Sequence, residues 1–164
     1  AQYRVDGFVS IGNSTGICDT GTARTSYRNV FIADCVGYDL YFLDEGSYSI
    51  HNAVVLSSAQ NPFTVTGRTA GDCRLKMENV LLRRLVETGT GLVAPRAVLE
   101  ADRCNVEGLE IQVSGEATWK NTLLNGEPSE AGATGADLAL LQTLVPEEYR
   151  CALLLSRAAT PIHP

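Results

Sequence analysis

The residues that could carry acid–base chemistry form a group of carboxylates in the first third of the chain. They are Asp34, Asp39, Asp44 and Glu45, with Asp19 a little earlier. Glycoside hydrolysis requires two carboxyl groups placed across the bond that is cut, and such a group could supply them. Asp44 and Glu45 directly precede Gly46, where acidic residues are common in turns. A solvated turn or surface position is therefore the favoured interpretation for each of the four candidates.

Three aromatic residues could bind a sugar by stacking on its apolar face. They are Trp119, Tyr38 and Tyr41. Trp119 could instead anchor the C-terminal part of the chain, and this is the favoured interpretation. The two tyrosines could equally pack within the fold.

The cysteines and histidines do not predict a metal site. Five cysteines are widely spaced, no two of them form a Cys-x-x-Cys pair, and only His51 and His163 could assist them. We expect no metal and no other cofactor. Reduced cysteines that act as small apolar interior groups are favoured, and disulfides are the alternative.

A repeated phrase predicts the elements that must position these side chains. An Asn or Asp precedes a short apolar run at Asp6, Asn29, Asn52, Asn79 and Asn105, at intervals of 23, 23, 27 and 26 residues. Repeats of this length indicate a stacked solenoid with one phrase per coil. Because Asn tolerates unusual backbone angles and both donates and accepts hydrogen bonds, the four asparagines are predicted to form a ladder at one corner. The alternative is a set of unrelated loop asparagines before buried strands.

The residues after each Asn or Asp predict an interior and an exterior. Small or aliphatic residues fill the first and third positions, which should line a common interior because alternate strand residues point to one side. The second position is also apolar and holds Phe8, Phe31, Val54 and Leu81. An outward stripe of this size should be covered. A loop or the C-terminal segment could cover it, the strand phase could be wrong by one residue, or another copy of the chain could pack there.

The phrases Tyr27-Arg-Asn-Val and Met77-Glu-Asn-Val resemble the rungs of right-handed parallel β-helix proteins. Pectate lyases, polygalacturonases, alginate epimerases and bacteriophage tailspikes share that fold, and the resemblance spans about residues 3–115. It implies an all-β, right-handed parallel β-helix over residues 1–115. Residues 116–164 would form a small mixed cap or oligomerisation segment. In that segment we predict a helix over residues 138–144, capped by Asp137, and a strand over residues 151–155.

Composition and charge exclude some functional classes. The chain has 164 residues, is 45% hydrophobic and carries a formal net charge of −6. No apolar run is long enough to span a membrane as a helix, so membrane insertion is not expected. The acidic balance and the lack of a basic stripe argue against non-specific nucleic-acid binding.

The resemblance implies a segment of a phage tailspike or tail fibre that recognises a bacterial surface polysaccharide and, in the full chain, could depolymerise it. The expected location is the virion tail or the extracellular space, and the expected assembly is a homotrimer with the apolar stripe between copies. The chain lacks the recurring Asp-Asp pair and the Arg-x-Pro-x-x-Arg stretch of the pectin enzymes, so at most part of an active site is expected here. The alternatives are a secreted polysaccharide lyase, glycoside hydrolase or epimerase of β-helix type, and a structural stalk.

Overall fold

Polar and apolar side chains alternate along the long strands, and this alternation decides the architecture. In β8 (Cys73–Arg84), for example, Cys73, Leu75 and Met77 are buried while Arg74 and Lys76 are exposed. A strand with one apolar side must cover that side, and stacked coils do so by enclosing a shared interior. The computed structural model, which describes residues 1–87 and 89–153, is an all-β solenoid of about five turns with 54% strand. The predicted fold class, a parallel β-helix, is confirmed.

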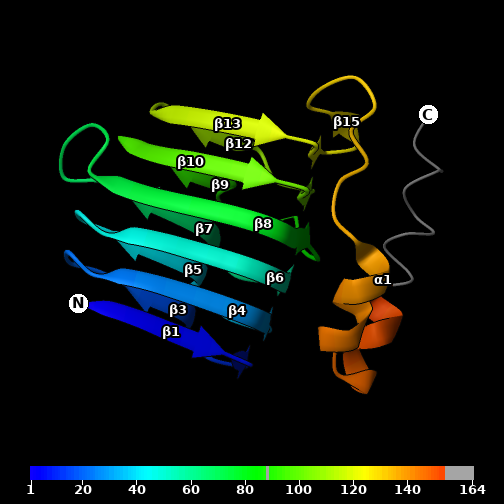
Figure 1. Ribbon diagram of the computed structural model, residues 1–164. Helices are drawn as coiled ribbons and strands as arrows, with labels where there is room; N and C mark the ends of the chain where they lie inside the picture. The colour runs from blue at the N-terminus through cyan, green and yellow to red at the C-terminus, as the bar shows by residue number, and fades with distance from the viewer. Residues whose placement is uncertain (88, 154–164) are drawn as a thin grey trace.

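Two sheets form the walls of the solenoid (Figure 1). Sheet A contains β1 (Gln2–Asp6), β2 (Val9–Ile11), β4 (Arg24–Ala33), β6 (Ser47–Ser57), β8, β10 (Ala97–Asp102), β11 (Asn105–Glu107), β13 (Glu116–Lys120), β14 (Leu123–Leu124) and β15 (Glu127–Pro128). Sheet B contains β3 (Thr15–Asp19), β5 (Tyr38–Leu43), β7 (Asn61–Thr66), β9 (Leu92–Ala94) and β12 (Ile111–Val113). Each strand pairs in parallel with its equivalent in the next coil, except that β14 and β15 pair antiparallel.

The asparagine ladder lies where the long strands of sheet A bend. Asn29, Asn52 and Asn79 adopt left-handed backbone angles, with φ of 54°, 56° and 55°. Their amide nitrogens donate along the stack, from Asn79 to Asn52 at 2.9 Å, from Asn52 to Asn29 at 3.4 Å and from Asn29 to Asp6 at 2.8 Å. The ladder prediction is therefore confirmed for Asn29, Asn52 and Asn79, and Asp6 extends the ladder by one residue.

Asn105 is not part of the ladder, so that element of the prediction is wrong. The pairing of Asp102 with Glu78 and of Asn105 with Leu81 places Arg103 at the corner. Arg103 takes the left-handed conformation there, with φ of 53°. Asn105 lies two residues later on the outer side, where its side-chain oxygen accepts from the backbone N–H of Ala136 at 2.8 Å.

The first coil is also shifted by one residue from the predicted phase. Gly7, with φ of 76°, occupies the corner next to Asn29, because Asp6 pairs with Arg28. Phe8 consequently faces inwards and packs against the interior cluster. Val9, which pairs with Phe31, takes the outward position. The assignment of Phe8 to the outer stripe is wrong.

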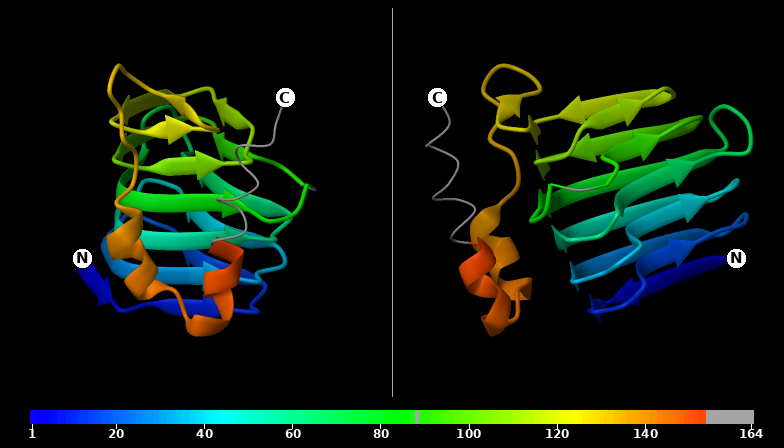
Figure 2. Two further views of the ribbon diagram at one scale, coloured as in Figure 1. Left: turned by 90° about the vertical axis from the view of Figure 1, so that its right-hand side faces the viewer. Right: turned by 180° about the vertical axis from the view of Figure 1, so that it is seen from behind.

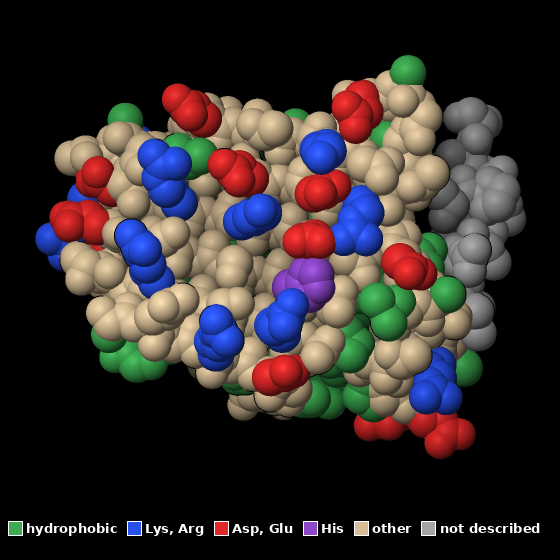
Figure 3. Space-filling view, viewed as in Figure 1, with side chains coloured by type: hydrophobic (Ala, Val, Ile, Leu, Met, Phe, Trp, Pro, Cys, Tyr) green, Lys and Arg blue, Asp and Glu red, His purple; other side chains and the backbone are tan. Residues whose placement is uncertain are grey.

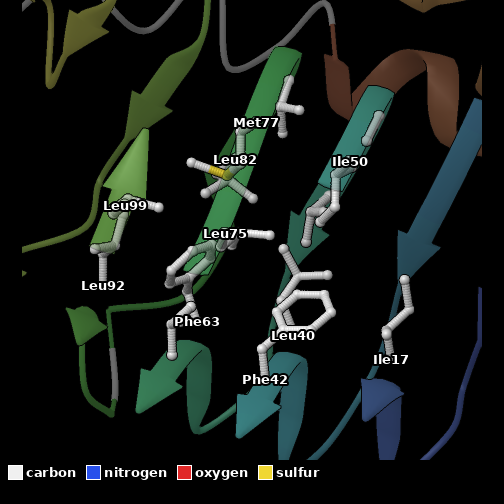
Figure 4. Packing of buried hydrophobic residues seen from close by; sticks show 14 of the residues in the cluster. Ile17, Leu40, Phe42, Ile50, Phe63, Leu75, Met77, Leu82, Leu92 and Leu99 are labelled. Carbon is white, nitrogen blue, oxygen red and sulfur yellow. The ribbon is translucent and has the colours of Figure 1, made fainter. Parts of the chain in front are cut away.

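The interior is filled by the inward side chains of both sheets (Figure 4). The predicted first and third positions after Asn29, Asn52 and Asn79, such as Val30 and Ile32, are buried there, whereas Gly7, Val9 and Gly108 are exposed. All five cysteines are free thiols, and burial raises the pKa of the Cys104 thiol to about 12. Buried thiols of this kind act as small apolar groups.

The C-terminal segment, residues 136–153, lies beside the ends of β4, β6 and β8 (Figure 2), and its side chains cover the outer apolar stripe there. Phe31, Val54 and Leu81 are at most 1% exposed. They pack against side chains that include Leu141, Val145 and Leu153. The alternative in which this segment closes the stripe is thus the one observed. Three of the four residues predicted to lie between copies are buried within one chain, and the homotrimer stays a prediction.

The segment itself begins as predicted. The side chain of Asp137 accepts from the backbone N–H of Leu140 at the start of α1 (Leu138–Leu141), and 3₁₀ helices Gln142–Leu144 and Glu147–Tyr149 follow. Residues 151–153 are helical, so the strand predicted there is wrong, and residues 154 and 155 lie outside the described residues. Parallel pairing continues into β13 and β14, beyond the boundary predicted at residue 115. Among the described residues, no helix is long and apolar enough to cross a membrane.

Candidate functional site

The outward side chains of six strands of sheet A form three rows that cross the strands. We call this surface the polar face, and it is turned towards the viewer in Figure 3. The first row is Gln2, Arg24, Ser47, Arg74, Val98 and Glu116; the second is Arg4, Ser26, Ser49, Lys76, Glu100 and Thr118; the third is Asp6, Arg28, His51, Glu78, Asp102 and Lys120. Seventeen of these eighteen side chains are polar or charged.

The polar face is hollowed where short side chains lie between long ones. A depression of about 490 Å³ is lined by Arg4, Ser26, Arg28, Ser49 and Lys76, together with Gln2, Ile50, His51 and Glu78. A second depression of about 230 Å³ shares Ser26, Ser49 and Lys76 with it and extends towards Arg24 and Ser47. Serines on β4 and β6 form the floor because their side chains are the shortest in the rows, and arginines and a lysine form the rim.

Charge is divided unevenly over this face. The outward residues of β1, β4, β6 and β8 include five Arg or Lys side chains and two Asp or Glu side chains. On β10 and β13 three carboxylates face outwards with one lysine. The two depressions, together called the groove, therefore lie in a cationic half of the face, formed by β1, β4, β6 and β8. The acidic half, formed by β10 and β13, lies next to it.

His51 and Glu78 form the closest acid–base contact on this face. The Nδ1 atom of His51 lies 3.4 Å from a carboxylate oxygen of Glu78, and Arg103 donates to the other oxygen at 2.5 Å. Glu78 is thus held by two partners, and His51 also lines the larger depression. A His–Glu contact can move a proton when a ligand lies against it.

The four predicted carboxylates do not come together as an acid–base pair. Asp34, at a turn with φ of 56°, accepts a hydrogen bond from the Tyr149 hydroxyl, which with burial raises the pKa of Tyr149 to about 12. Asp34 therefore holds the C-terminal segment. Asp44 and Glu45 lie in a turn, where hydrogen bonds from Thr20 and then from Arg68 lower the pKa of Asp44.

Asp39 is the exception among the four, because it is fully buried rather than at the surface. One carboxylate oxygen accepts from the hydroxyl of Ser57, and the other has no hydrogen-bond partner among the described residues. Desolvation raises the pKa of Asp39 to about 6. Because the described residues leave Asp39 0% exposed, its carboxyl is not at a surface that a substrate could contact.

The predicted glycan-stacking residues lie away from the polar face. Tyr38 and Tyr41 stack on each other on β5 in sheet B, with ring centroids 4.2 Å apart and planes 9° apart. Trp119 occupies an inward-facing position of β13, beside Ala101 of β10, and packs against the interior cluster. Among the described residues, the side chains that pack with the C-terminal segment 136–153 form a separate cluster, so docking of that segment by Trp119 stays a prediction.

Sequence reasoning missed the groove residues, although a signal for them was present. They alternate with buried residues before each corner asparagine, as Ser26 and Arg28 do around Tyr27, and Ser49 and His51 do around Ile50. The phrase that predicts the coils lies after the asparagine instead. The alternation before it could have identified an outward polar face.

Comparisons of the chain with protein-family models, with curated proteins and with solved structures found no match. The candidate site therefore rests on its own geometry. Over residues 1–87 and 89–153, no group of three or more His, Cys, Asp or Glu side chains could hold a metal ion.

Proposed function

We propose that this chain is the glycan-recognition part of an extracellular attachment protein, such as a phage tailspike or tail fibre, and that its polar face binds a bacterial surface polysaccharide. The observation that supports the proposal is the serine-floored groove on a rigid parallel sheet. Rigid elements hold binding side chains with little conformational freedom, so less entropy is lost on binding.

The repeat of the coils suits a polymeric ligand. Equivalent side chains recur at the strand spacing of about 4.8 Å, so a sugar chain that lies across the strands meets a hydrogen-bonding group on each coil. Serine hydroxyls both donate and accept, and guanidinium groups donate in a fixed fork, which matches the hydroxyl and oxygen atoms of sugars. A structural stalk, the second alternative, would have no use for such a groove and would show no glycan affinity.

The contact between His51 and Glu78 favours one other candidate, a polysaccharide lyase, hydrolase or epimerase of β-helix type. Such an enzyme would use His51 as an acid or base against a sugar in the groove. We nevertheless expect little or no cleavage by residues 1–164, because the four carboxylates predicted for catalysis are dispersed. Rapid turnover that His51→Ala abolishes would replace binding with catalysis as the function.

The proposal is tested by binding of the purified chain to bacterial surface polysaccharides. Ser49→Trp fills the groove floor with a large side chain that a strand accommodates well, and it should abolish saturable binding. Thr64→Trp places the same side chain on the outer side of β7 in sheet B, and it should leave binding unchanged. Equal binding by the two variants, or no binding by the wild-type chain, would refute the proposal.

A further inference from the structure

We propose that the ligand of the polar face is a polyanionic polysaccharide, one whose repeating units carry carboxylate, sulfate or phosphate groups, and that it lies over β1, β4, β6 and β8. This inference rests on the proposed function and specifies the chemical class of the glycan. Three observations on the cationic half of the face support it: its net positive charge, the absence of ion pairs between its cations and the described carboxylates, and the distances between those cations.

The outward residues of β1, β4, β6 and β8 are positively charged, although the chain as a whole is acidic. With five Arg or Lys and two Asp or Glu side chains, the outward residues of these four strands carry a net charge of +3, with His51 taken as neutral. The whole chain carries −6, so all its other residues together carry −9. A positive area on an acidic body focuses anions onto that area, while the rest of the surface repels them.

The cations of these four strands have no carboxylate partner among the described residues. Arg4, Arg24, Arg28, Arg74 and Lys76 form no ion pair within 4.0 Å with any residue that the structure describes. Arginines elsewhere, such as Arg83 and Arg103, do contact carboxylates. The positive charges on the face are therefore available to carboxylate, sulfate or phosphate groups, which guanidinium binds in a bidentate manner.

The cations around the groove lie too far apart for one small anion to contact them all. Arg24 and Arg74 lie in one row two strands apart, a separation of about 10 Å, and Arg4 and Lys76 lie in the next row three strands apart, about 14 Å. A small anion could touch only one or two of them. A chain with a charge on each repeating unit could contact them all, with its uncharged hydroxyls on Ser26 and Ser49.

The same surface argues against a nucleic acid. No Phe, Tyr or Trp side chain occurs in the three outward rows, whereas single-stranded nucleic acids stack their bases on such aromatic rings. The acidic half formed by β10 and β13 would repel any polyanion that extended over it, because Glu100, Asp102 and Glu116 face outwards there. The charged stretch of the ligand should therefore end near β8.

The experiment measures the affinity of the full chain for polygalacturonate, dextran sulfate, polyglycerol phosphate, neutral dextran and a single-stranded oligothymidylate, by biolayer interferometry. We expect at least one of the acidic polysaccharides to bind about tenfold more tightly than dextran, and its affinity to fall between roughly 50 and 300 mM NaCl. The polymer that binds best identifies the charged group.

A pair of variants with equal charge change localises the effect. Arg28→Gln combined with Lys76→Gln should weaken binding to the acidic polysaccharide by about tenfold or more. Arg68→Gln combined with Arg150→Gln, both at exposed positions off the polar face, should change it by less than about twofold.

Three results would overturn the inference, and they separate it from the proposed function. Salt-independent binding to dextran as tight as to every acidic polymer would refute the anionic class but keep a glycan ligand. Tightest binding to oligothymidylate would assign the face to nucleic acid. Binding to none of the polysaccharides, charged or neutral, would remove both this inference and the support for glycan recognition.

Discussion

The buried carboxyl of Asp39 makes the stability of this protein depend on pH in an unusual direction. Its side chain is fully enclosed, with Ser57 as a hydrogen-bond donor to one oxygen and no partner among the described residues for the other. Burial raises the pKa from the ordinary 3.8 to about 6 in the folded state. The folded protein therefore holds this proton more strongly than the unfolded chain does.

The sign and size of the effect follow from linkage. Below pH 3.8 both states are protonated at Asp39, and the group has no net effect on the free energy of unfolding. As pH rises from 3.8 to about 6, the unfolded chain loses the proton while the folded protein still holds it. Asp39 therefore lowers the free energy of unfolding progressively over this pH range. A shift of about two pKa units corresponds to about 3 kcal/mol of stability that is absent above pH 6.

Asp39→Asn removes the titration and keeps an oxygen for the Ser57 hydroxyl. We expect the difference in unfolding free energy, variant minus wild type, to increase by about 3 kcal/mol between pH 3 and pH 8. Urea titrations at a series of pH values, followed by the fluorescence of the single tryptophan, Trp119, measure it. The pH dependence is the readout, because the constant cost of the amide group cancels in it.

Asp44→Asn is the matched control. Asp44 is at the surface, and hydrogen bonds from Thr20 and Arg68 lower its pKa, so its removal should change stability with the opposite pH dependence and a smaller size. A pH-independent difference for Asp39→Asn, or a wild-type protein that gains stability relative to this variant above pH 6, would refute the reasoning.

Three other predictions concern the ladder, the covered stripe and the assembly. Asn52→Leu leaves the Asn29 side-chain oxygen and an Asn79 amide N–H unpaired and puts Leu at a left-handed position, so it should lower the free energy of unfolding in urea by about 1–3 kcal/mol. A loss below about 0.5 kcal/mol would mean that the ladder is not stabilising. Phe31→Ala opens a cavity beneath the C-terminal segment and should cost about 3–5 kcal/mol, with faster proteolysis of that segment than in the wild type; unchanged proteolysis would contradict the packing. The predicted homotrimer now depends on the end of the stripe at Val9, which is 58% exposed, and Val9→Asp should weaken the trimer that light scattering is expected to show. A monomeric wild-type protein would end that prediction.

The fold was predictable because the coil corner needs a specific residue type. Asn29, Asn52 and Asn79 recur where the backbone becomes left-handed, and the apolar residues after them repeat in phase. A corner is not predictable in this way where a residue other than Asn adopts the left-handed conformation. Arg103 adopts the left-handed conformation at the fourth corner, and Asn105, two residues later, only imitates the pattern.

The candidate site was harder to predict because it depends on register across coils of unequal length. Ser49 lies beside Lys76, 27 residues later, whereas Ser26 lies beside Ser49, 23 residues later. Each charge alone looks like an ordinary solvated residue. The positive surface exists only once the pairing of the strands is known, and the sequence does not show which cations lack carboxylate neighbours.

The cover over the apolar stripe has a consequence for biosynthesis. The contacts that hold it join residues far apart in sequence: Asp137 to Asn79, Leu153 to Arg83 and Tyr149 to Asp34 are separated by 58, 70 and 115 positions. A ribosome would therefore complete the coils around Phe31 well before residues 136–153 emerge, and during that interval the growing chain would display an apolar surface. Slow elongation or premature termination in that region should make the nascent protein a client of chaperones, even though the finished molecule conceals the same surface.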